Sequence, residues 1–205
     1  FIESLKLLSE NSDLKKEVVV FIMVPAHIKG ARMDLATSLQ NTEIRFEASN
    51  RFTTHDLYDY YNDPVMSTIH WFHFTNQQTQ KVKIIFVPSY LNGADGIFNK
   101  SYYDLVIGMD LTIFPSYYEP WGYTPLESLA FAVPTVTTSL AGFGSWIQTH
   151  CTTDHPAAEV VERDEDNYGR VVSSIVSKII EISKLDEQKR NIYKQNAREV
   201  SKIAL

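Results

Sequence analysis

The sequence predicts an α/β domain built on a doubly wound parallel sheet. Short apolar runs, each bounded by proline, glycine or polar residues, alternate with stretches of helical spacing. Hydrophobicity inside these runs is continuous rather than alternating, which indicates strands covered on both faces. Strands that alternate with helices along a chain are typical of a parallel sheet with helices on both sides.

The expected strands are the five apolar runs. In chain order they are Val18–Val24, Val82–Val87, Leu111–Phe114, Thr135–Thr138 and Glu159–Val161. A proline directly follows each of the first three runs, where it ends the strand because it has no N–H to donate. The longest run, Val18–Val24, is far too short to span a bilayer, so no membrane partner is expected.

The long segment 29–80 separates the first two expected strands. Helical spacing predicts three helices in it, at Arg32–Phe46, Thr54–Tyr61 and Pro64–Phe74. Such an insertion is long for a simple crossover, so we expect it to shape a surface or a partner contact.

The chain closes with two expected helices between Tyr168 and Leu205. Asp186 is the expected cap of the second helix. The apolar side chains of the first recur at helical spacing and are expected to be buried: Val171, Ile175, Ile179 and Ile182.

Composition and charge exclude several classes of function. The 205 residues carry a net charge of −6, with a pI near 5.5, so no basic surface is offered to nucleic acid or anionic lipid. The single cysteine, Cys151, excludes an intrachain disulfide framework and a multi-cysteine zinc site. With no secretory signal in the sequence, we expect a cytoplasmic protein.

Two local patterns suggest a ligand and are better explained by structure. His70 and His73 lie three residues apart, but no third ligand is near in sequence, so aromatic packing is expected rather than metal binding. Gly142 to Gly144 lacks the full glycine fingerprint of a dinucleotide site and is expected to form a turn before a helix that runs to His150.

The stretch Phe114–Glu127 carries the predicted chemistry. A strand ends at its start and a helix begins near Thr124, so the loop between them lies where open α/β sheets bind ligands. Thr124 is the expected N-cap, with Pro125 at the first helical position. The N–H groups of Gly122, Tyr123 and Thr124 would then face outwards from a positive helix end, which accepts phosphate.

Two carboxylates, Glu119 and Glu127, flank this expected anion site. Ionised carboxylates are acceptors only, so sugar hydroxyls are natural partners for them. A plainer explanation also fits each group: Thr124 and Glu127 alone form the capping box of an ordinary helix, and Glu119 before Pro120 is a solvated loop residue.

The whole string from Phe114 to Glu127, F-P-S-Y-Y-E-P-W-G-Y-T-P-L-E, resembles the signature of glycogen synthases of the animal and fungal type. The similarity covers most of the chain and is weak from about Lys29 to Ser49. It continues in five further segments: Tyr58–Pro64, Val82–Pro88, Tyr102–Gly108, Pro134–Thr138 and Leu140–Gly144.

That resemblance implies a fold and a reaction. Residues 1–205 would be the nucleotide-sugar-binding C-terminal part of a retaining glycosyltransferase with the two-domain GT-B architecture, and the N-terminal acceptor domain would lie outside this chain. A Rossmann-like core of about residues 1–165 would be followed by helices at about 167–205. The reaction would transfer glucose from UDP-glucose to the non-reducing end of an α-1,4-glucan, with no cofactor and no metal ion.

The resemblance also implies partners and leaves alternatives. UDP-glucose and glycogen would be the partners, and a homo-oligomer is left open. The donor-site motifs alone leave open another GT-B transferase, acting on sucrose or a lipid-linked glycan, and a nucleotide-sugar-binding module without catalysis.

Carried over residue by residue, the resemblance implies two groups of site residues. At the sugar, Glu119 would hold the glucose hydroxyls as the catalytic residue, either as a nucleophile or in a front-side mechanism, and Trp121 and Gly122 would line the pocket. At the nucleotide, Tyr123 and Thr124 would bind the diphosphate. Glu127 would bind the ribose and Tyr102 would stack on the uracil.

The sequence departs from the family pattern at two points. The family's Arg and Lys, on a loop just upstream, are absent here, so we expect this chain alone to bind UDP weakly and not to transfer glucose. The family's dense arginine run is reduced to four cations, so we expect a solvated face rather than activation by glucose 6-phosphate. These cations are Lys189, Arg190, Lys194 and Arg198.

Overall fold

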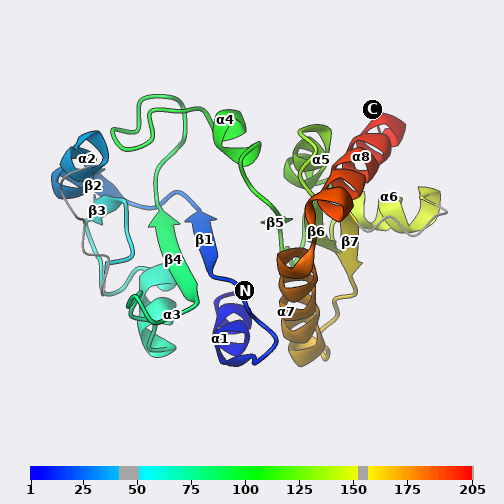
Figure 1. Cartoon of the computed structure of the whole chain (residues 1–205), viewed down its shortest axis with the longest axis horizontal. Helices are drawn as coiled ribbons and strands as arrows, with labels where there is room; N and C mark the ends of the chain where they lie inside the picture. Colours follow the sequence, from blue (N-terminus) through cyan, green and yellow to red (C-terminus); the bar gives the residue numbers. More distant parts are fainter. Residues whose placement is uncertain (42–50, 152–156, 205) are drawn as a thin grey trace. The chain divides into compact units, whose positions relative to one another are not determined.

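The computed structural model describes residues 1–41, 51–151 and 157–204. They form two compact units, Ile2–Tyr102 and Tyr103–Leu205, and Phe1 is grouped with the second. Figure 1 shows each unit as a small parallel sheet accompanied by helices. The predicted α/β class with parallel strands is therefore confirmed, whereas the single doubly wound sheet stays a prediction, because the strands of the described residues lie in three small sheets.

The first unit is organised around two parallel strands, β1 (Val18–Met23) and β4 (Val82–Val87). They pair in register along their whole length. Helix α1 (Ile2–Glu10) precedes them and places Leu5 and Leu8 in the core, where both are fully buried. Both strands fall on predicted apolar runs.

One of the three helices predicted between these strands is wrong. The segment Thr54–Tyr61 holds β3 (His55–Leu57), which pairs antiparallel with β2 (Ile28–Ala31) and continues into turns. The N–H of Thr54 donates to the carbonyl of Phe86 at 3.0 Å. Because distant strands satisfy this backbone, tertiary pairing overrides the local helical spacing.

The other two predicted helices form with shorter bounds. Helix α2 (Met33–Gln40) occupies part of the predicted Arg32–Phe46, and residues 42–46 lie outside the described residues. Helix α3 (Pro64–Trp71) ends three residues before the predicted Phe74. The side chain of Asp63 caps α3, because it accepts hydrogen bonds from two N–H groups of the first turn.

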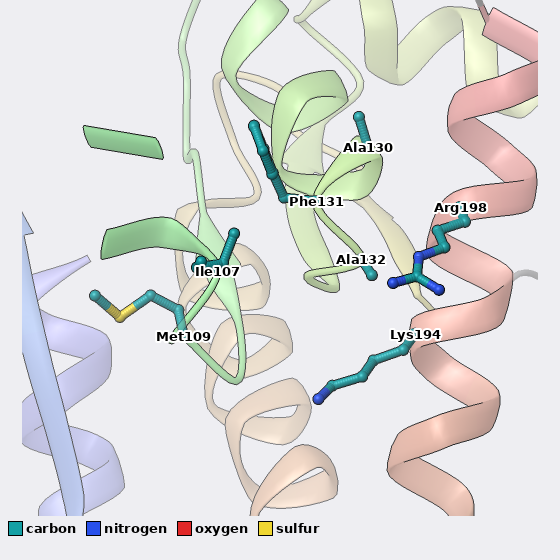
Figure 2. Close-up of a pocket in the computed structure, with 7 residues that line it drawn as sticks. All are labelled: Ile107, Met109, Ala130, Phe131, Ala132, Lys194 and Arg198. Atoms are coloured by element: carbon teal, nitrogen blue, oxygen red, sulfur yellow. The ribbon is translucent and has the colours of Figure 1, made fainter. Parts of the chain in front are cut away.

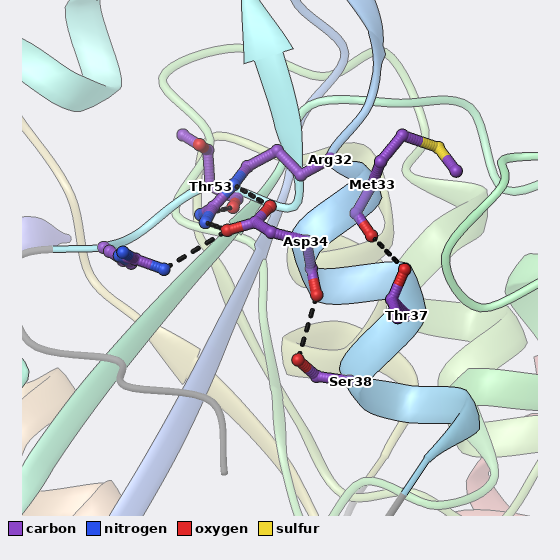
Figure 3. Close-up of polar contacts among 7 residues, drawn as sticks. Arg32, Met33, Asp34, Thr37, Ser38 and Thr53 are labelled. Atoms are coloured by element: carbon purple, nitrogen blue, oxygen red, sulfur yellow. Dashed lines mark hydrogen bonds and ion pairs between the residues drawn. The ribbon is translucent and has the colours of Figure 1, made fainter. Parts of the chain in front are cut away.

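Polar contacts fix the start of α2 (Figure 3). The guanidinium of Arg32 donates to the carboxylate of Asp34 at 2.5 and 3.2 Å and to the carbonyl of Thr53 at 3.0 Å. The hydrogen bond from Arg32, with the charges of Arg32 and Arg51, lowers the pKa of Asp34. An ionised acid in the first turn also suits the positive end of the helix. Arg32 thus joins α2 to the chain that leads into β3.

The second unit holds a three-stranded parallel sheet in the order β5 (Thr112–Ile113), β6 (Thr135–Thr138) and β7 (Ala158–Val161). All three strands fall on predicted runs, and β5 is shorter than predicted. The helices of this part of the chain are α4 (Tyr102–Val106), α5 (Tyr123–Ala130), α6 (Gly142–His150), α7 (Tyr168–Lys184) and α8 (Glu187–Ala204).

Helices α5, α6 and α8 share one apolar core. Figure 1 shows α5 beside α8, and the two helices are in contact. Leu129 from α5, Phe143 from α6 and Val200 from α8 are all fully buried in this core. Burial of each such side chain stabilises the folded state by about 1.5–3 kcal/mol.

The two C-terminal helices form as predicted. The carboxylate of Asp186 accepts the N–H of Lys189 at 2.8 Å, which confirms it as the cap of α8. The predicted buried face of α7 is also confirmed, since all its members are buried: Val171, Ile175, Ile179 and Ile182.

A buried lysine joins β7, α7 and α8. Lys178 is 3 % exposed, and its ammonium lies 3.2 Å from the carboxylate of Glu159 and 3.3 Å from that of Glu181. The ammonium also lies 5.4 Å from the ring centroid of Tyr193, whose hydroxyl donates to Glu181. Because a buried ammonium needs compensation, these partners keep the cation inside the unit.

Helix α6 begins directly against the loop that precedes α5. The turn predicted for Gly142 to Gly144 is wrong, because both glycines belong to the first turn of α6. A Cβ on Gly142 would lie 2.2 Å from the carbonyl oxygen of Pro120. The N–H of Gly142 instead donates to the carbonyl of Glu119 at 2.9 Å. Glycine is required here because only a backbone without a side chain comes this close.

The Gly142→Ala substitution is expected to displace the loop before α5. We expect the free energy of unfolding to fall by about 2 kcal/mol or more, because the new methyl group meets a carbonyl rather than a flexible side chain. Urea denaturation measures this change. The matched control is Gly169→Ala on α7, where a Cβ meets no atom within 4 Å. Equal stability of both variants would contradict the close approach.

The Lys178→Ala substitution is expected to destabilise the same unit. It removes the cation between two carboxylates and leaves a cavity, so we expect the free energy of unfolding to fall by about 2 kcal/mol. Loss of a partner in a fully buried ion pair would cost more, but here both carboxylates reach solvent. Lys178→Met keeps most of the buried volume and should lose less. Thermal unfolding of both variants measures the difference. A loss for Lys178→Ala no larger than that for Lys178→Met would argue against the volume term.

Candidate functional site

The candidate site is built on the loop between β5 and α5. Phe114 still pairs with β6, since its N–H donates to the carbonyl of Val136 at 2.8 Å. Beyond this point the loop turns against the start of α6, where the N–H of Phe143 donates to the carbonyl of Trp121 at 2.6 Å. A loop at the carboxyl end of a parallel strand is the usual ligand-binding position in α/β sheets.

Arg163, two residues after the end of β7, holds the same loop, and no sequence pattern indicates this role. Its side chain is buried, with 9 % exposed, and donates to the carbonyl of Pro115 at 2.6 Å. Its guanidinium lies 3.4 Å from the ring centroid of Tyr117. A planar cation against an aromatic face, with a carbonyl as acceptor, satisfies a buried arginine. The first half of the loop is therefore fixed from inside the unit.

The predicted cap of α5 is wrong. Helix α5 starts at Tyr123, and Gly122 is its N-cap with φ +99°. Thr124 and Pro125 therefore lie within the first turn rather than at the cap and the first position. Glycine tolerates the left-handed backbone, and proline is tolerated because N–H groups in a first turn have no acceptor within the helix. The helix consequently begins two residues earlier than predicted.

The start of α5 has exposed features that attract anions. The side chains of Tyr123 and Thr124 are exposed, whereas Gly122 is buried. No side chain hydrogen bond caps this helix end in the described part of the chain. The N–H groups of a first turn and the helix dipole make such an end attractive to phosphate.

Glu119 lies beside this helix end. A Cβ on Gly122 would be 3.4 Å from the Cγ of Glu119, so the stem of the glutamate passes close to Gly122. The main-chain N–H of Glu119 donates to Leu140 at 3.4 Å, and its side chain is exposed. The backbone of Glu119 is thus fixed while its carboxylate reaches solvent.

Glu127 lies on α5, one helical turn after Tyr123, and has a partner that the sequence did not reveal. The hydroxyl of Tyr103 on α4 donates to the Oε1 atom of Glu127 at 3.0 Å. This hydrogen bond and the negative charge of Glu127 raise the pKa of Tyr103. The pair Tyr102–Tyr103 was visible in the sequence, but nothing in its spacing pointed to α5.

Trp121 and Tyr102, the remaining predicted site residues, lie in different surroundings. Trp121 is half-buried, and its ring packs edge-on against Phe143, with centroids 5.8 Å apart. Tyr102 is the first residue of α4, and its N–H donates to Leu91 at 2.9 Å. Its contact with uracil remains a prediction.

A separate pocket lies at the other end of α5 (Figure 2). It has a volume of about 350 Å³ and is lined by Phe131, Ala132 and neighbouring apolar residues, with Lys194 and Arg198 of α8. Arg190, a third of the four predicted surface cations, donates to Asp110 at 2.5 Å. The predicted solvated face is confirmed for Lys189, Lys194 and Arg198, which are exposed, whereas Arg190 is half-buried and paired.

The predicted packing of the aromatic helix is confirmed for one histidine. The ring of His70 lies 5.9 Å from that of Phe52 and 5.8 Å from that of Tyr60.

Burial raises the pKa of the Cys151 thiol. Among the described residues, no group of three or more His, Cys, Asp and Glu is arranged to hold a metal ion. In the same residues, no helix has the length and apolar character needed to cross a membrane.

Comparison with known proteins identifies the relatives of the chain. Human liver glycogen [starch] synthase is 44% identical over 98 residues, which cover 48% of this chain and 14% of the human protein. The rat liver protein has the same identity and coverage. Glycogen [starch] synthase isoform 1 of Saccharomyces cerevisiae is 42% identical over 101 residues, covering 49% of this chain and 14% of the yeast protein.

The matched segment is thus a small part of each curated relative, about one seventh of its length. A sequence model of the family described as glycogen synthase matches residues 38–204. That range is well over half of the chain and includes the β5–α5 loop, Gly122 and both flanking glutamates. The resemblance drawn from the sequence is therefore confirmed, and the chain belongs to the glycogen synthase family.

Proposed function

We propose that this chain is the donor-binding part of a cytoplasmic retaining glucosyltransferase of GT-B architecture. It binds UDP-glucose, and the complete protein transfers the glucose to the non-reducing end of an α-1,4-glucan such as glycogen. The observation that carries the proposal is the open N-terminal end of α5, with Glu119 beside it and Glu127 one turn further along. Family membership selects this ligand among the anions that such a helix end accepts.

The diphosphate lies at the first turn of α5 in this proposal. As the bond between glucose and UDP breaks, negative charge grows on the leaving diphosphate. N–H groups that already point outwards at Tyr123 and Thr124 stabilise that charge without having to reorganise. A rigid helix end is suited to this task because Gly142 and Arg163 fix the preceding loop.

The two carboxylates have different tasks. Glu119, beside Gly122, accepts hydrogen bonds from the glucose hydroxyls and stabilises the positive charge that develops on the sugar. Glu127 accepts hydrogen bonds from the ribose hydroxyls, and Tyr102 stacks on the uracil. Trp121 and Gly122 complete the sugar pocket. The transfer proceeds without a metal ion in this proposal, so activity of the complete protein is expected to survive EDTA.

Substitution of Glu127 is expected to lower the affinity for UDP, whereas substitution of Glu119 is expected to lower kcat. In the complete protein, Glu127→Gln should weaken UDP binding about tenfold, because it weakens charge-assisted hydrogen bonds to the ribose. Glu119→Gln should leave UDP binding nearly unchanged and lower kcat about a hundredfold or more. Calorimetry with UDP and labelled-glucose transfer to glycogen measure the two effects.

The matched control for both is Glu187→Gln, an exposed glutamate at the start of α8. Its binding and its activity should equal those of the wild type. Unchanged UDP binding in Glu127→Gln would place the ribose elsewhere and contradict this part of the proposal.

The complete protein and this chain alone are expected to differ in activity. With glycogen as acceptor, the complete protein should incorporate glucose from UDP-glucose in preference to ADP-glucose, GDP-mannose and UDP-N-acetylglucosamine. The chain alone should bind UDP weakly and incorporate none. Glucose transfer by the chain alone would contradict the expectation that transfer needs the complete protein. Binding without transfer by the complete protein would favour a nucleotide-sugar-binding module, and transfer only to sucrose or a lipid-linked glycan would favour another transferase.

A further inference from the structure

Tyr103 holds one oxygen of Glu127 through a contact between two neighbouring helices. Its hydroxyl donates to Oε1 at 3.0 Å, and its ring packs against Phe131 with centroids 5.3 Å apart. Phe131 is the C-cap of α5, so the tyrosine contacts the same helix at two points. The ring contact and the hydrogen bond together determine where the hydroxyl lies relative to the carboxylate.

A glutamate on a helix surface otherwise samples several rotamers. Glu127 extends from α5 in the N-terminal direction, as helical side chains do, towards the turn that contains Tyr123. A donor that holds Oε1 selects the rotamers compatible with that bond. An ionised carboxylate has about four acceptor positions, so acceptor capacity remains for a ligand after Oε1 has bound one hydroxyl.

The hydrogen bond has little to contribute to stability. Tyr103 is 44 % exposed and Phe131 is 40 % exposed, so water competes for the hydroxyl and the ring buries little area. A tyrosine phenol is protonated, and therefore a donor, throughout the neutral range, and its hydrogen bond to Glu127 raises the pKa of Tyr103 further in the same direction. Removal of the hydroxyl should accordingly leave the fold intact while it frees Glu127 to rotate.

We infer that Tyr103 is a positioning residue that orients the Glu127 carboxylate towards the ribose hydroxyls of the bound nucleotide. This inference rests on the proposed function, because it assumes that a uridine nucleotide lies at the start of α5. It adds a residue from α4 to that site. The ribose is the affected group because Tyr103 contacts Glu127 and not Glu119 in the described contacts.

The test compares nucleotides that differ only in the ribose. Calorimetry on the complete protein measures the affinities for UDP, 2′-deoxy-UDP, 3′-deoxy-UDP and inorganic pyrophosphate. Wild type should prefer UDP about tenfold over at least one deoxy form, the value of one charge-assisted hydrogen bond. Tyr103→Phe should reduce that preference about threefold or more, with pyrophosphate affinity and melting temperature unchanged.

Three further variants sharpen the readout. Glu127→Gln should lower the preference more than Tyr103→Phe, and the double variant should match Glu127→Gln, because a positioning residue acts only through its partner. Tyr168→Phe is the matched control, since Tyr168 is 47 % exposed and lies at the start of α7. Its preference should equal that of the wild type.

Each contrary outcome has a distinct meaning. Full retention of the ribose preference in Tyr103→Phe would overturn the inference. An equal loss of affinity for UDP and for both deoxy forms would also overturn it, because Tyr103 would then act on the base or the phosphates. A wild-type protein that binds pyrophosphate as tightly as UDP, and UDP as tightly as both deoxy forms, would overturn both the inference and the proposed nucleotide site.

Discussion

The candidate site depends on main-chain contact between the β5–α5 loop and the first turn of α6. Two N–H groups of α6, from Gly142 and Phe143, donate to carbonyls on either side of Pro120. The approach is so close that a single methyl group at Gly142 would collide with the Pro120 carbonyl. Because the bonds involve backbone atoms, the loop position depends little on the side chains that the loop presents. Glu119 and Tyr118 can therefore reach solvent without loss of order in the chain that carries them.

This arrangement separates structural from chemical residues within one short stretch. Inside the unit, Arg163 satisfies the Pro115 carbonyl and Gly142 satisfies that of Glu119. Outside, the exposed side chains of Glu119, Tyr123 and Thr124 surround the start of α5. The family signature thus contains residues needed to build the loop as well as residues proposed to contact the donor. Trp121 belongs partly to the first group, since its ring packs against Phe143.

The sequence was most informative where local pattern and tertiary environment agree. The runs Val82–Val87 and Thr135–Thr138 are strands with the predicted bounds, because buried parallel strands need uninterrupted apolar or β-branched residues. Asp186 caps α8 for a purely local reason. The helix predicted for Thr54–Tyr61 was wrong because the strand in this segment pairs with Ile28–Ala31, a partner that local spacing does not reveal.

At the site, the cap at Thr124 failed because Gly122 adopts a positive φ and starts the helix earlier. Residue types therefore predicted the loop and the two carboxylates near the start of α5, whereas backbone geometry set the helix start, and the anion site itself stays a prediction. The contacts of Tyr103 and Arg163 were not predictable, because they join residues 24 and 48 positions apart. Such contacts depend on how helices and strands pack, and no periodicity encodes them.

The cation–aromatic contact between Arg163 and Tyr117 has a consequence for binding affinity. The loop before α5 is held by a buried guanidinium and by the backbone of α6, so its backbone is already ordered. In the proposed function, a ligand at the start of α5 would therefore not have to order this loop, and its binding would lose little conformational entropy there.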